Sequence, residues 1–471
     1  MQTGSSTHRT RMFGRLLVLT CALCSCDAIR ADSPAGDDAR PTAVAARLDA
    51  ADAVRQATSA DVLAMLPDGE EKRRFIIDCT NCHVMDSASV LIDGVIRSQA
   101  QWEETVARML GYAGADTDFP VMTPGRSAAA TAEWMSRHIT HAPRPAAGSR
   151  ILPEGARIDE FLLPVAEDLP HDVAVLEDGR ILVTGMFTHQ MWLLDPRDGT
   201  WSTERIPVPA ANPRAVDLMR GANGVTDWWV LLGNPHLVAH RDGETGEWRT
   251  FDIGLYGHSI IPDAAGRVWF NSHFTKDPGV VGYVDARTGT IRTFDIPTPL
   301  AATDGGTPIP YGLRIAPDGA AWLTELRGNR IVRVDPETGS VTSYDMPLSV
   351  SGPRRPDFDA SGSLWIPEYA GGALTRFDAA AETFERHPLP IADAAPYVVR
   401  VDRRRDRIWV GTGTADAAFL FDPVTGQFTT YPLPSRGALV RHMDIDDASG
   451  EVWLAYGASP GSAARIARIR P

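Results

Sequence analysis

A tryptophan inside a short apolar run recurs along the chain from about residue 180 onward. The runs read DWWVLLG, RVWFNS, AAWLTE, SLWIPE, RIWVGT and EVWLAY, with Trp229, Trp269, Trp322, Trp365, Trp409 and Trp453 as their tryptophans. Neighbouring tryptophans are 40 to 53 residues apart, and RILVTG around Leu182 is a degenerate first copy. Short apolar runs bounded by polar turn residues predict β-strands.

Each run is followed by a turn segment and a further strand. The turn segments read LLDPRDGTW, AHRDGETGEW, YVDARTGTI, RVDPETGSV, RFDAAAETF and LFDPVTGQF. In most copies an aspartate opens the turn and a glycine supplies the positive φ that closes it, so each copy predicts a β-hairpin. Four short strands repeated every 40 to 50 residues are typical of a β-propeller, and seven copies predict seven blades. An open β-sandwich array is the alternative for the same strands.

The last copy ends in ARIARIRP without an outer strand. The segment ARIDEFLLP at 156–164 has the right pattern to supply that strand and to close the ring. The predicted fold is therefore mainly β, with a propeller over residues 156–471.

The apolar spacing before the repeat is helical instead. Apolar residues fall on one helical face of segment 98–114: Trp102, Val106, Met109 and Leu110. Segment 127–140 predicts a closing helix with Ser127 as N-cap. Residues 65–141 therefore predict a small all-α domain, followed by a linker at 142–155.

The first 31 residues have the pattern of an export signal. Arg9, Arg11 and Arg15 precede the apolar run LLVLTCALCSC, which is too short to span a bilayer. LCSC at 23–26 resembles a bacterial lipobox, so the alternatives are a lipidated Cys26 and simple cleavage near residue 32. Residues 32–64 are rich in Ala, Asp and Pro and predict a flexible tether. The expected location is the periplasm or the exterior, with a membrane contact only through a lipid at Cys26.

The net charge and the cysteine content limit the kinds of partner and the kinds of stabilising bond to be expected. The net charge is −14, and no basic stripe is available to neutralise phosphates, which argues against a nucleic-acid partner. Once an export signal is removed, Cys79 and Cys82 are the remaining cysteines apart from Cys26. A disulfide framework is therefore not expected.

The segment Cys79-Thr80-Asn81-Cys82-His83 admits three interpretations. A thioredoxin-like redox pair needs a βαβ context, whereas the preceding residues predict a helix. A zinc site needs four ligands, and no second ligand cluster lies nearby in the sequence. A covalent haem c needs two cysteines for thioethers and an adjacent histidine as axial ligand, which favours Cys79, Cys82 and His83 as the seat of one haem.

The second axial ligand is expected from the irregular stretch DFPVMTPGR, which holds Met122. This stretch resembles the proline-containing loop of class I c-type cytochromes, whose distal methionine precedes the last helix. The resemblance covers residues 65–141 and implies electron transfer with a periplasmic redox partner. The rival ligands are Met109, Met85, Met135 and His138, and an iron with an open distal position is the further alternative.

The segment IPYGLRIAPDGAAWLTELRGNRIVRVDPETG at 309–339 resembles a blade of the streptogramin lyase (virginiamycin B lyase) family of seven-bladed propellers. That resemblance covers about residues 160–471 and implies a C–O lyase that uses a histidine base, a glutamate, a second histidine and a magnesium ion. Glu325 matches the glutamate and His258 the second histidine, whereas Tyr311 stands at the position of the base. A magnesium ion at Glu325 and Glu368 is the metal site that the resemblance implies.

Aligning the copies places one residue of each blade at the entrance of its innermost strand, facing the central channel. These funnel residues are His171, Arg214, His258, Tyr311, Arg354, Tyr397 and Arg441. A second ring follows each tryptophan and includes Ser272, Glu325, Glu368 and Tyr456. The three arginines of the first ring favour an anionic or carboxylate-bearing ligand.

Together these features favour an exported mono-haem c-type cytochrome in which electron transfer is coupled to binding of a ligand or substrate at the propeller funnel. The alternatives are a lyase acting on a cyclic depsipeptide or related ester, and a non-catalytic scaffold that docks a redox partner. A tyrosine is a poor general base near neutral pH, so Tyr311 weighs against the lyase.

Overall fold

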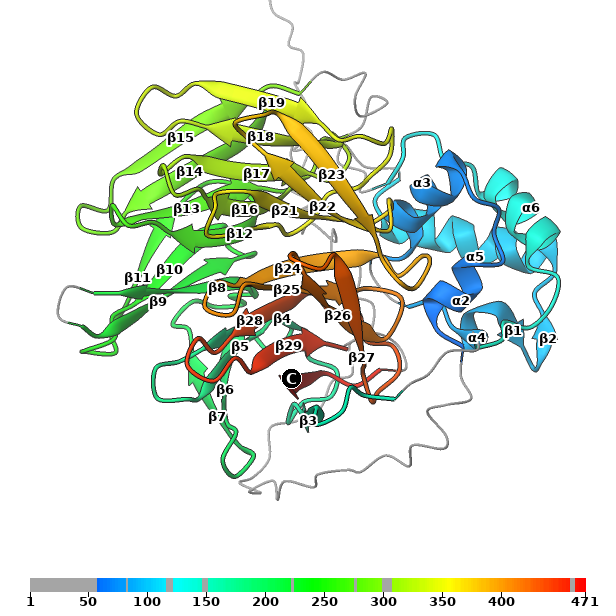
Figure 1. Ribbon diagram of the computed structural model, residues 1–471, viewed down its shortest axis with the longest axis horizontal. Helices are drawn as coiled ribbons and strands as arrows, with labels where there is room; N and C mark the ends of the chain where they lie inside the picture. Colours follow the sequence, from blue (N-terminus) through cyan, green and yellow to red (C-terminus); the bar gives the residue numbers. More distant parts are fainter. Residues whose placement is uncertain are drawn as a thin grey trace, which may run out of the picture.

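The computed structural model describes residues 57–81, 84–115, 122–145, 151–221, 224–274, 278–298, 307–457 and 462–471. Within them, seven four-stranded antiparallel sheets are arranged as the blades of a propeller (Figure 1). The predicted mainly β, seven-bladed propeller is confirmed, and the alternative of an open β-sandwich array is wrong. The predicted export signal, Cys26 and residues 32–56 of the predicted tether lie outside the described residues.

The first four blades follow one another along the chain. Blade one comprises β4 (Pro170–Val175), β5 (Ile181–Gly185), β6 (Gln190–Asp195) and β7 (Thr200–Arg205). Blade two comprises β8 (Pro213–Arg220), β9 (Thr226–Leu232), β10 (Leu237–Arg241) and β11 (Trp248–Asp252). Blade three comprises β12 (Gly257–Pro262), β13 (Arg267–Ser272), β14 (Gly279–Asp285) and β15 (Ile291–Ile296). Blade four comprises β16 (Pro310–Ile315), β17 (Ala321–Glu325), β18 (Arg330–Val334) and β19 (Val341–Asp345).

The last three blades complete the ring. Blade five comprises β20 (Asp357–Phe358), β21 (Leu364–Glu368), β22 (Ala373–Asp378) and β23 (Thr383–Pro388). Blade six comprises β24 (Pro396–Asp402), β25 (Arg407–Thr412), β26 (Ala417–Asp422) and β27 (Gln427–Pro432). Blade seven joins β28 (His442–Ile445), β29 (Val452–Tyr456) and β30 (Arg465–Arg470) to β3 (Arg157–Leu162). β3 pairs with β30 from Arg157↔Arg470 to Leu162↔Arg465, so the expected closing strand is confirmed.

The repeated tryptophan packs in the hydrophobic layers that separate the blades, and in blades three and five its indole nitrogen is hydrogen-bonded to a turn aspartate. Trp269 Nε1 donates to Asp263 Oδ2 at 2.8 Å, and Trp365 Nε1 donates to Asp359 Oδ2 at 2.8 Å. A buried indole N–H needs such a partner, which explains why an aspartate stands six residues before the tryptophan in these copies.

The hairpin turns have the predicted backbone. Gly199 and Gly339 close the turns of blades one and four at φ of 75° and 74°. Blade five lacks the glycine in this turn, and there Glu382 adopts φ of 53°. The αL conformation is therefore required by the turn, and glycine is the residue that adopts it without steric cost.

A helical domain precedes the propeller. Its elements are α2 (Ser59–Leu63), α3 (Glu70–Cys79), α4 (Ser87–Val90), α5 (Gln99–Tyr112) and α6 (Ala128–His138), with a small ribbon of β1 (Leu91–Ile92) and β2 (Val95–Ile96). Ser127 caps α6 as predicted, because its hydroxyl accepts from the backbone of Ala130. The predicted tether at 32–64 is wrong at its C-terminal end, because α2 is capped by Thr58 and Asp61 and buries Val62. A helix this short shows no clear apolar period in the sequence.

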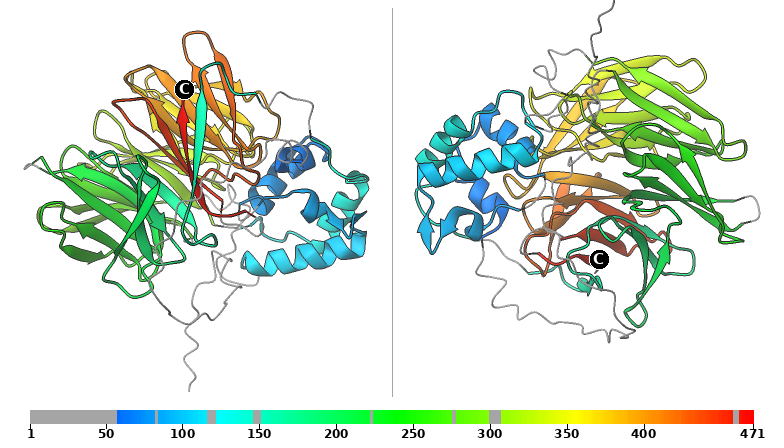
Figure 2. Two further views of the ribbon diagram at one scale, coloured as in Figure 1. Left: turned by 90° about the horizontal axis from the view of Figure 1, so that it is seen from below. Right: turned by 180° about the vertical axis from the view of Figure 1, so that it is seen from behind.

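The helical domain packs against the loops of blades five and six (Figures 1 and 2). Lys72 on α3 forms an ion pair with Asp393 at 2.6 Å, and the backbone of Ala60 donates to Thr414 O at 3.0 Å. Ile77 lies against Gly352, where an added Cβ would approach to 3.0 Å. One continuous hydrophobic cluster runs from the helices into the propeller, so the two domains share part of their core.

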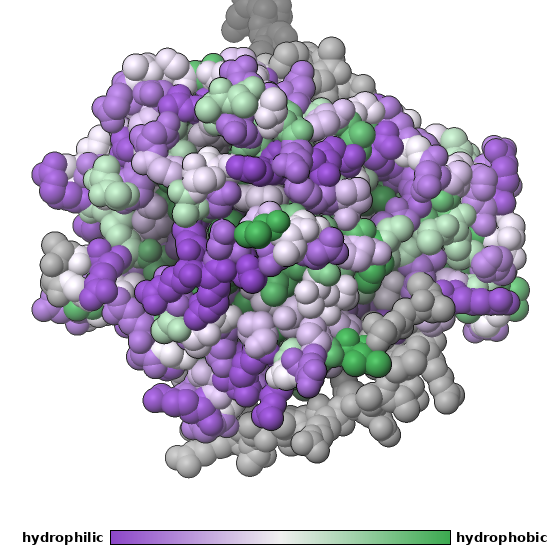
Figure 3. All heavy atoms as spheres, in the orientation of Figure 1, coloured by the Kyte–Doolittle hydropathy of each residue, from purple (hydrophilic) through white to green (hydrophobic). Residues whose placement is uncertain are grey.

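The surface seen in Figure 3 is mostly hydrophilic, with apolar residues scattered over it. No helix in the described part of the chain is long and apolar enough to cross a membrane.

Candidate functional site

The seven funnel residues are all buried at the inner edges of the blades. In five blades the innermost strand shifts register at this residue, at the breaks Pro170/Val173, Pro213/Ala215, Gly257/Ile260, Pro310/Leu313 and Pro396/Val398. A β-bulge re-aims the side chain at the break. The bulges thus give His171, Arg214, His258, Tyr311 and Tyr397 the same local setting. Direct contacts join five of the seven funnel residues, namely His171, His258, Tyr311, Arg354 and Tyr397.

Arg354 lies at the centre of a tyrosine cluster. Its guanidinium carbon is 3.8 Å from the ring centroid of Tyr369, 4.2 Å from that of Tyr397 and 4.7 Å from that of Tyr311. Arg354 Nη1 also donates to Tyr311 Oη at 2.5 Å, and the Tyr311 and Tyr397 hydroxyls form a hydrogen bond. Sequence reasoning missed Tyr369, although it directly follows the ring glutamate Glu368.

Three imidazoles lie beside this cluster. The His258 ring is 3.9 Å from the Tyr311 ring, 4.5 Å from the His273 ring and 5.6 Å from the His171 ring, measured between centroids. Burial and nearby arginines hold the pKa of His258 and of His273 well below the usual range, and burial lowers the pKa of His171 to about 3. These rings are therefore neutral at pH 7. His273 lies one residue after the second ring and was not predicted.

A buried ion pair crosses the channel from blade one to the entrance of blade five. Arg355 Nη2 lies 2.9 Å from Asp172 Oδ1, and His442 Nε2 lies 3.5 Å from Asp172 Oδ2. Despite its burial, Asp172 has a pKa held well below the usual range, because Arg355 lies beside it. Neither Arg355 nor Asp172 was predicted, because each immediately follows a funnel residue and alternation alone would point it away from the channel.

Glu325 and Glu368 are engaged by arginines of their own blades. Glu325 pairs with Arg330 at 2.7 Å and accepts from Thr298 at 2.8 Å. Glu368 pairs with Arg386 at 2.8 Å. Within the described residues, no group of three His, Cys, Asp or Glu side chains could hold a metal ion. The magnesium site implied at these glutamates stays a prediction, and each carboxylate already has an arginine as counter-ion.

The two central tyrosines differ in acidity. Burial raises the pKa of Tyr311. Burial also acts to raise the pKa of Tyr397, but the combined positive charges of Arg354, Arg355 and Arg441 outweigh it and lower that pKa. Tyr397 is thus the more acidic member of the hydrogen-bonded pair and the first of the two to lose its proton as the pH rises.

The Cys79 segment lies at the end of α3, and Cys82 and His83 lie outside the described residues. The stretch after Met122 is tied to this helix end, because the Thr123 backbone donates to Asp78 Oδ1 at 2.9 Å and Arg126 Nε pairs with Asp78 Oδ2 at 2.6 Å. Met122 itself is 4% exposed. The chain thus brings the predicted distal ligand to the helix on which the CxxCH segment begins.

This segment also contacts the propeller. Tyr369 Oη donates to Thr80 O at 2.8 Å and lies 2.7 Å from Thr80 Oγ1. Arg327 Nη1 donates to Met122 O. Tyr369 also stacks on Arg354. This one side chain therefore joins the Cys79 segment to the funnel residues of the propeller.

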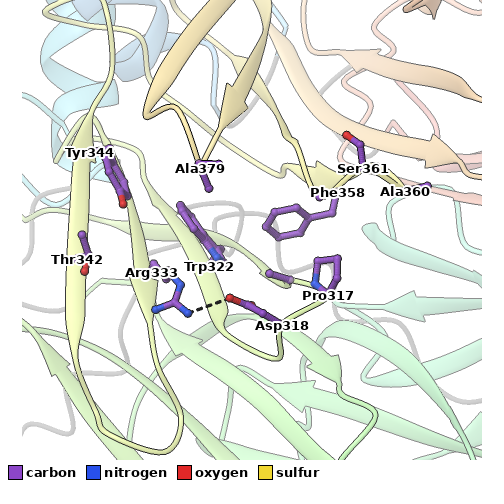
Figure 4. A pocket seen from close by; sticks show the side chains of 13 residues that line it. Pro317, Asp318, Trp322, Arg333, Thr342, Tyr344, Phe358, Ala360, Ser361 and Ala379 are labelled. Carbon is purple, nitrogen blue, oxygen red and sulfur yellow. Dashed lines mark hydrogen bonds and ion pairs between the residues drawn. The ribbon is translucent and has the colours of Figure 1, made fainter.

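A surface groove of about 550 Å³ lies between blades four and five, away from the ring (Figure 4). Trp322, Tyr344 and Phe358 line it, and an ion pair of 2.9 Å between Arg333 and Asp318 crosses its floor. None of the predicted site residues lines this groove.

Comparison with known proteins identifies the type of propeller. The sequence profile of the Virginiamycin B lyase family matches residues 303–471. The virginiamycin B lyase of Nocardia farcinica (strain IFM 10152) is 31% identical over 125 residues, which are 26% of this chain and 43% of that protein. The chain therefore spans less than half the length of that curated relative.

Solved structures agree on the fold. Virginiamycin B lyase from Staphylococcus aureus has a TM-score of 0.56 at 18% identity, over 67% of this chain and 99% of that chain. A streptogramin B lyase structure has a TM-score of 0.57 at 20% identity, over 67% of this chain and 97% of that chain. The domain that follows the helices, from β3 to β30, is therefore a virginiamycin B lyase-like seven-bladed β-propeller.

Proposed function

We propose that this chain is an exported mono-haem c-type cytochrome whose helical domain is docked on a ligand-binding propeller. Cys79 and Cys82 would hold the haem covalently, with His83 and Met122 as axial ligands. The haem would supply one-electron chemistry through its Fe(III)/Fe(II) couple. A redox partner in the periplasm would exchange electrons with it, and Cys26 would anchor the protein if it is lipidated.

The observation that carries this proposal is the hydrogen bond from the Thr123 backbone to Asp78 Oδ1. It joins a loop holding a methionine to the residue before Cys79, across 45 positions of sequence. A second observation concerns Trp102, a buried residue whose indole nitrogen has no hydrogen-bond partner within the described residues. Buried indole N–H groups normally have one, so this donor is available to a polar group.

The residues of this chain have positioning roles in that scheme. Asp78 holds the Met122 loop against α3 through Thr123 and Arg126. Tyr369 and Arg327 hold the Cys79 and Met122 segments on the propeller and limit their motion. The docked arrangement would place the redox centre next to the buried ring rather than at the end of a free tether.

The test is purification from a host with haem c maturation, followed by visible spectra in the oxidised and reduced forms. A reduced c-type α-band that persists after acid–acetone extraction is expected, together with its loss in Cys79→Ser. Met122→Ala should abolish the charge-transfer band of a methionine-ligated ferric haem, and Met109→Ala is the matched control. A chain that carries no covalent haem after such maturation contradicts the proposal.

The second candidate is a lyase, favoured by the match of residues 303–471 to the Virginiamycin B lyase family. Tyr397 would then act as the base, since three arginines lower its pKa. Linearisation of a cyclic depsipeptide by the wild type and its loss in Tyr397→Phe would support this candidate. Absence of turnover would leave the electron-transfer protein or the docking scaffold.

A further inference from the structure

The guanidinium of Arg354 is buried without a carboxylate partner. Arg354 is 1% exposed, and its Nε and Nη2 atoms have no hydrogen-bond partner within the described residues. The tyrosine rings stack on the guanidinium but leave these N–H groups unused, and only Nη1 donates to Tyr311. A buried charge with unpaired donors is costly, so such groups in native proteins point to a partner that binds there.

The neighbouring arginine provides an internal comparison. Arg355 is also buried and its Nε likewise has no partner in the described residues, but its guanidinium pairs with Asp172 at 2.9 Å. Arg354 forms no ion pair of this kind in the described residues. Arg214 and Arg441, on the same ring, add positive charge to the channel, which favours an anion and opposes a cation.

His258 supplies a complementary acceptor. Its Nδ1 lies 3.0 Å from Tyr311 O, a carbonyl that can only accept, so Nδ1 carries the proton. The ring is neutral, because burial and neighbouring charges lower its pKa. Nε2 therefore presents a lone pair, and it has no partner within the described residues. His258 and Arg354 both lie against the Tyr311 ring.

We propose that the propeller channel binds a small oxoanion that also carries an O–H group, with its charged oxygens on Arg354 Nε and Nη2 and its O–H donated to His258 Nε2. A 2-hydroxycarboxylate has this chemistry, and so does hydrogen phosphate. The inference deepens the ligand-binding part of the proposed function and names the ligand class. It does not depend on the haem.

The test is isothermal titration calorimetry on the full chain with four probes: lactate, propionate, phosphate and sulfate. Lactate should bind at least tenfold more tightly than propionate, which lacks the hydroxyl, if the ligand is organic. If the ligand is inorganic, phosphate should bind more tightly than sulfate, because sulfate has no O–H at neutral pH. Either preference supports the proposed site. A preference for lactate over propionate identifies an organic ligand, and a preference for phosphate over sulfate identifies an inorganic one.

Variants assign the two ends of the ligand. Arg354→Gln should lower the affinity for the preferred anion at least tenfold. Arg180→Gln, at an exposed arginine of blade one, should leave that affinity unchanged. His258→Asn should remove the preference for the O–H ligand while the affinity for its analogue stays within about twofold. This second variant keeps the proposal testable if Arg354→Gln does not fold.

Absence of binding by all four probes to the wild type, or equal affinity in Arg354→Gln, overturns the proposal. Equal preference for the O–H ligand in His258→Asn overturns the role of that histidine. The visible spectrum is recorded on the same samples. Anion binding without a c-type spectrum would contradict only the haem proposal, and a c-type spectrum without anion binding would contradict only this one.

Discussion

The helical domain and the propeller bury polar groups in different ways. In the described part of the helical domain, the core is aliphatic and aromatic, and its buried charges are few and paired, as in Arg126 with Asp78. The propeller instead concentrates arginines, histidines and tyrosines at its centre, and several of their polar atoms lack protein partners. Three buried polar atoms of the described helical domain also lack a protein partner, Arg73 Nε, Asn81 Oδ1 and Trp102 Nε1, but they are not gathered in one place as the donors and acceptors of Arg354 and His258 are around Tyr311.

This difference predicts that acid destabilises the propeller first, which is the largest effect expected. His171, His258, His273 and His442 have folded-state pKa values below the unfolded value of about 6.5, chiefly because of burial. The unfolded state then binds protons first as the pH falls, so stability that is complete above about pH 6.5 is lost below it. Each histidine contributes up to ~1.4 kcal/mol per pH unit, for His171 down to about pH 3.

Urea unfolding at pH 7 and pH 5, followed by hydrogen-exchange mass spectrometry, separates the two domains. Peptides of β13 should lose protection well before those of α5. The histidines described in the helical domain, His138 and His141, lie outside its buried core and serve as the internal control. Asp217, whose pKa burial raises to about 6, acts in the opposite direction, but the four histidines outnumber it. Parallel loss of protection in both domains would show that they unfold as one unit.

The second largest effect on stability is expected from replacing a tryptophan of the repeat. Trp269→Ala leaves a cavity between blades and removes the bond to Asp263, at a cost of about 3–5 kcal/mol in the free energy of unfolding. Val424→Ala, at a residue 82% exposed in a turn, should change it by less than about 0.5 kcal/mol. Chemical denaturation measures both. A cost for Trp269→Ala similar to that of the control would refute the packing role of the repeat.

In the helical domain, the corresponding element is the ion pair beneath the Met122 loop. Asp78→Asn removes the buried partner of Arg126 and leaves the half-exposed Glu71, at 3.0 Å, as its counter-charge, at a cost of about 3 kcal/mol. Glu133→Gln removes an exposed pair with Arg137 and should cost less than about 1 kcal/mol. Hydrogen exchange in α6 reports the change. If β13 lost protection as much as α6, the pair would stabilise the whole chain rather than this domain.

The smallest effect concerns the contact between the domains. Tyr369→Phe keeps the ring on Arg354 but removes the hydrogen bonds to Thr80, at a cost of about 1 kcal/mol. Faster exchange of the Thr80 segment is expected, with β21 unchanged. Tyr344→Phe, which removes a weak surface contact to Glu382, is the matched control. Unchanged exchange at Thr80 would mean that the Cys79 segment is held on the propeller by other contacts.

The sequence by itself determined the propeller and its closing strand. Those features depend on local alternation and on a repeat spacing that is visible in one dimension. The helices at 98–114 and 127–140 could also be predicted from the sequence, because a helix cap and an apolar face are formed by residues close together in the chain. The two observed helices, Gln99–Tyr112 and Ala128–His138, differ from the predicted ranges only at their ends.

The tertiary structure alone decided which partners the polar residues have. Tyr369 meets Thr80 across 289 positions of sequence, and Arg355 meets Asp172 across 183. Glu325 and Glu368 looked like site carboxylates from their spacing, yet arginines on other strands of the same blades pair with them. Charge pairing depends on distance in space, which a sequence period does not specify. That Arg354 has no carboxylate partner among the described residues became apparent only in the folded chain.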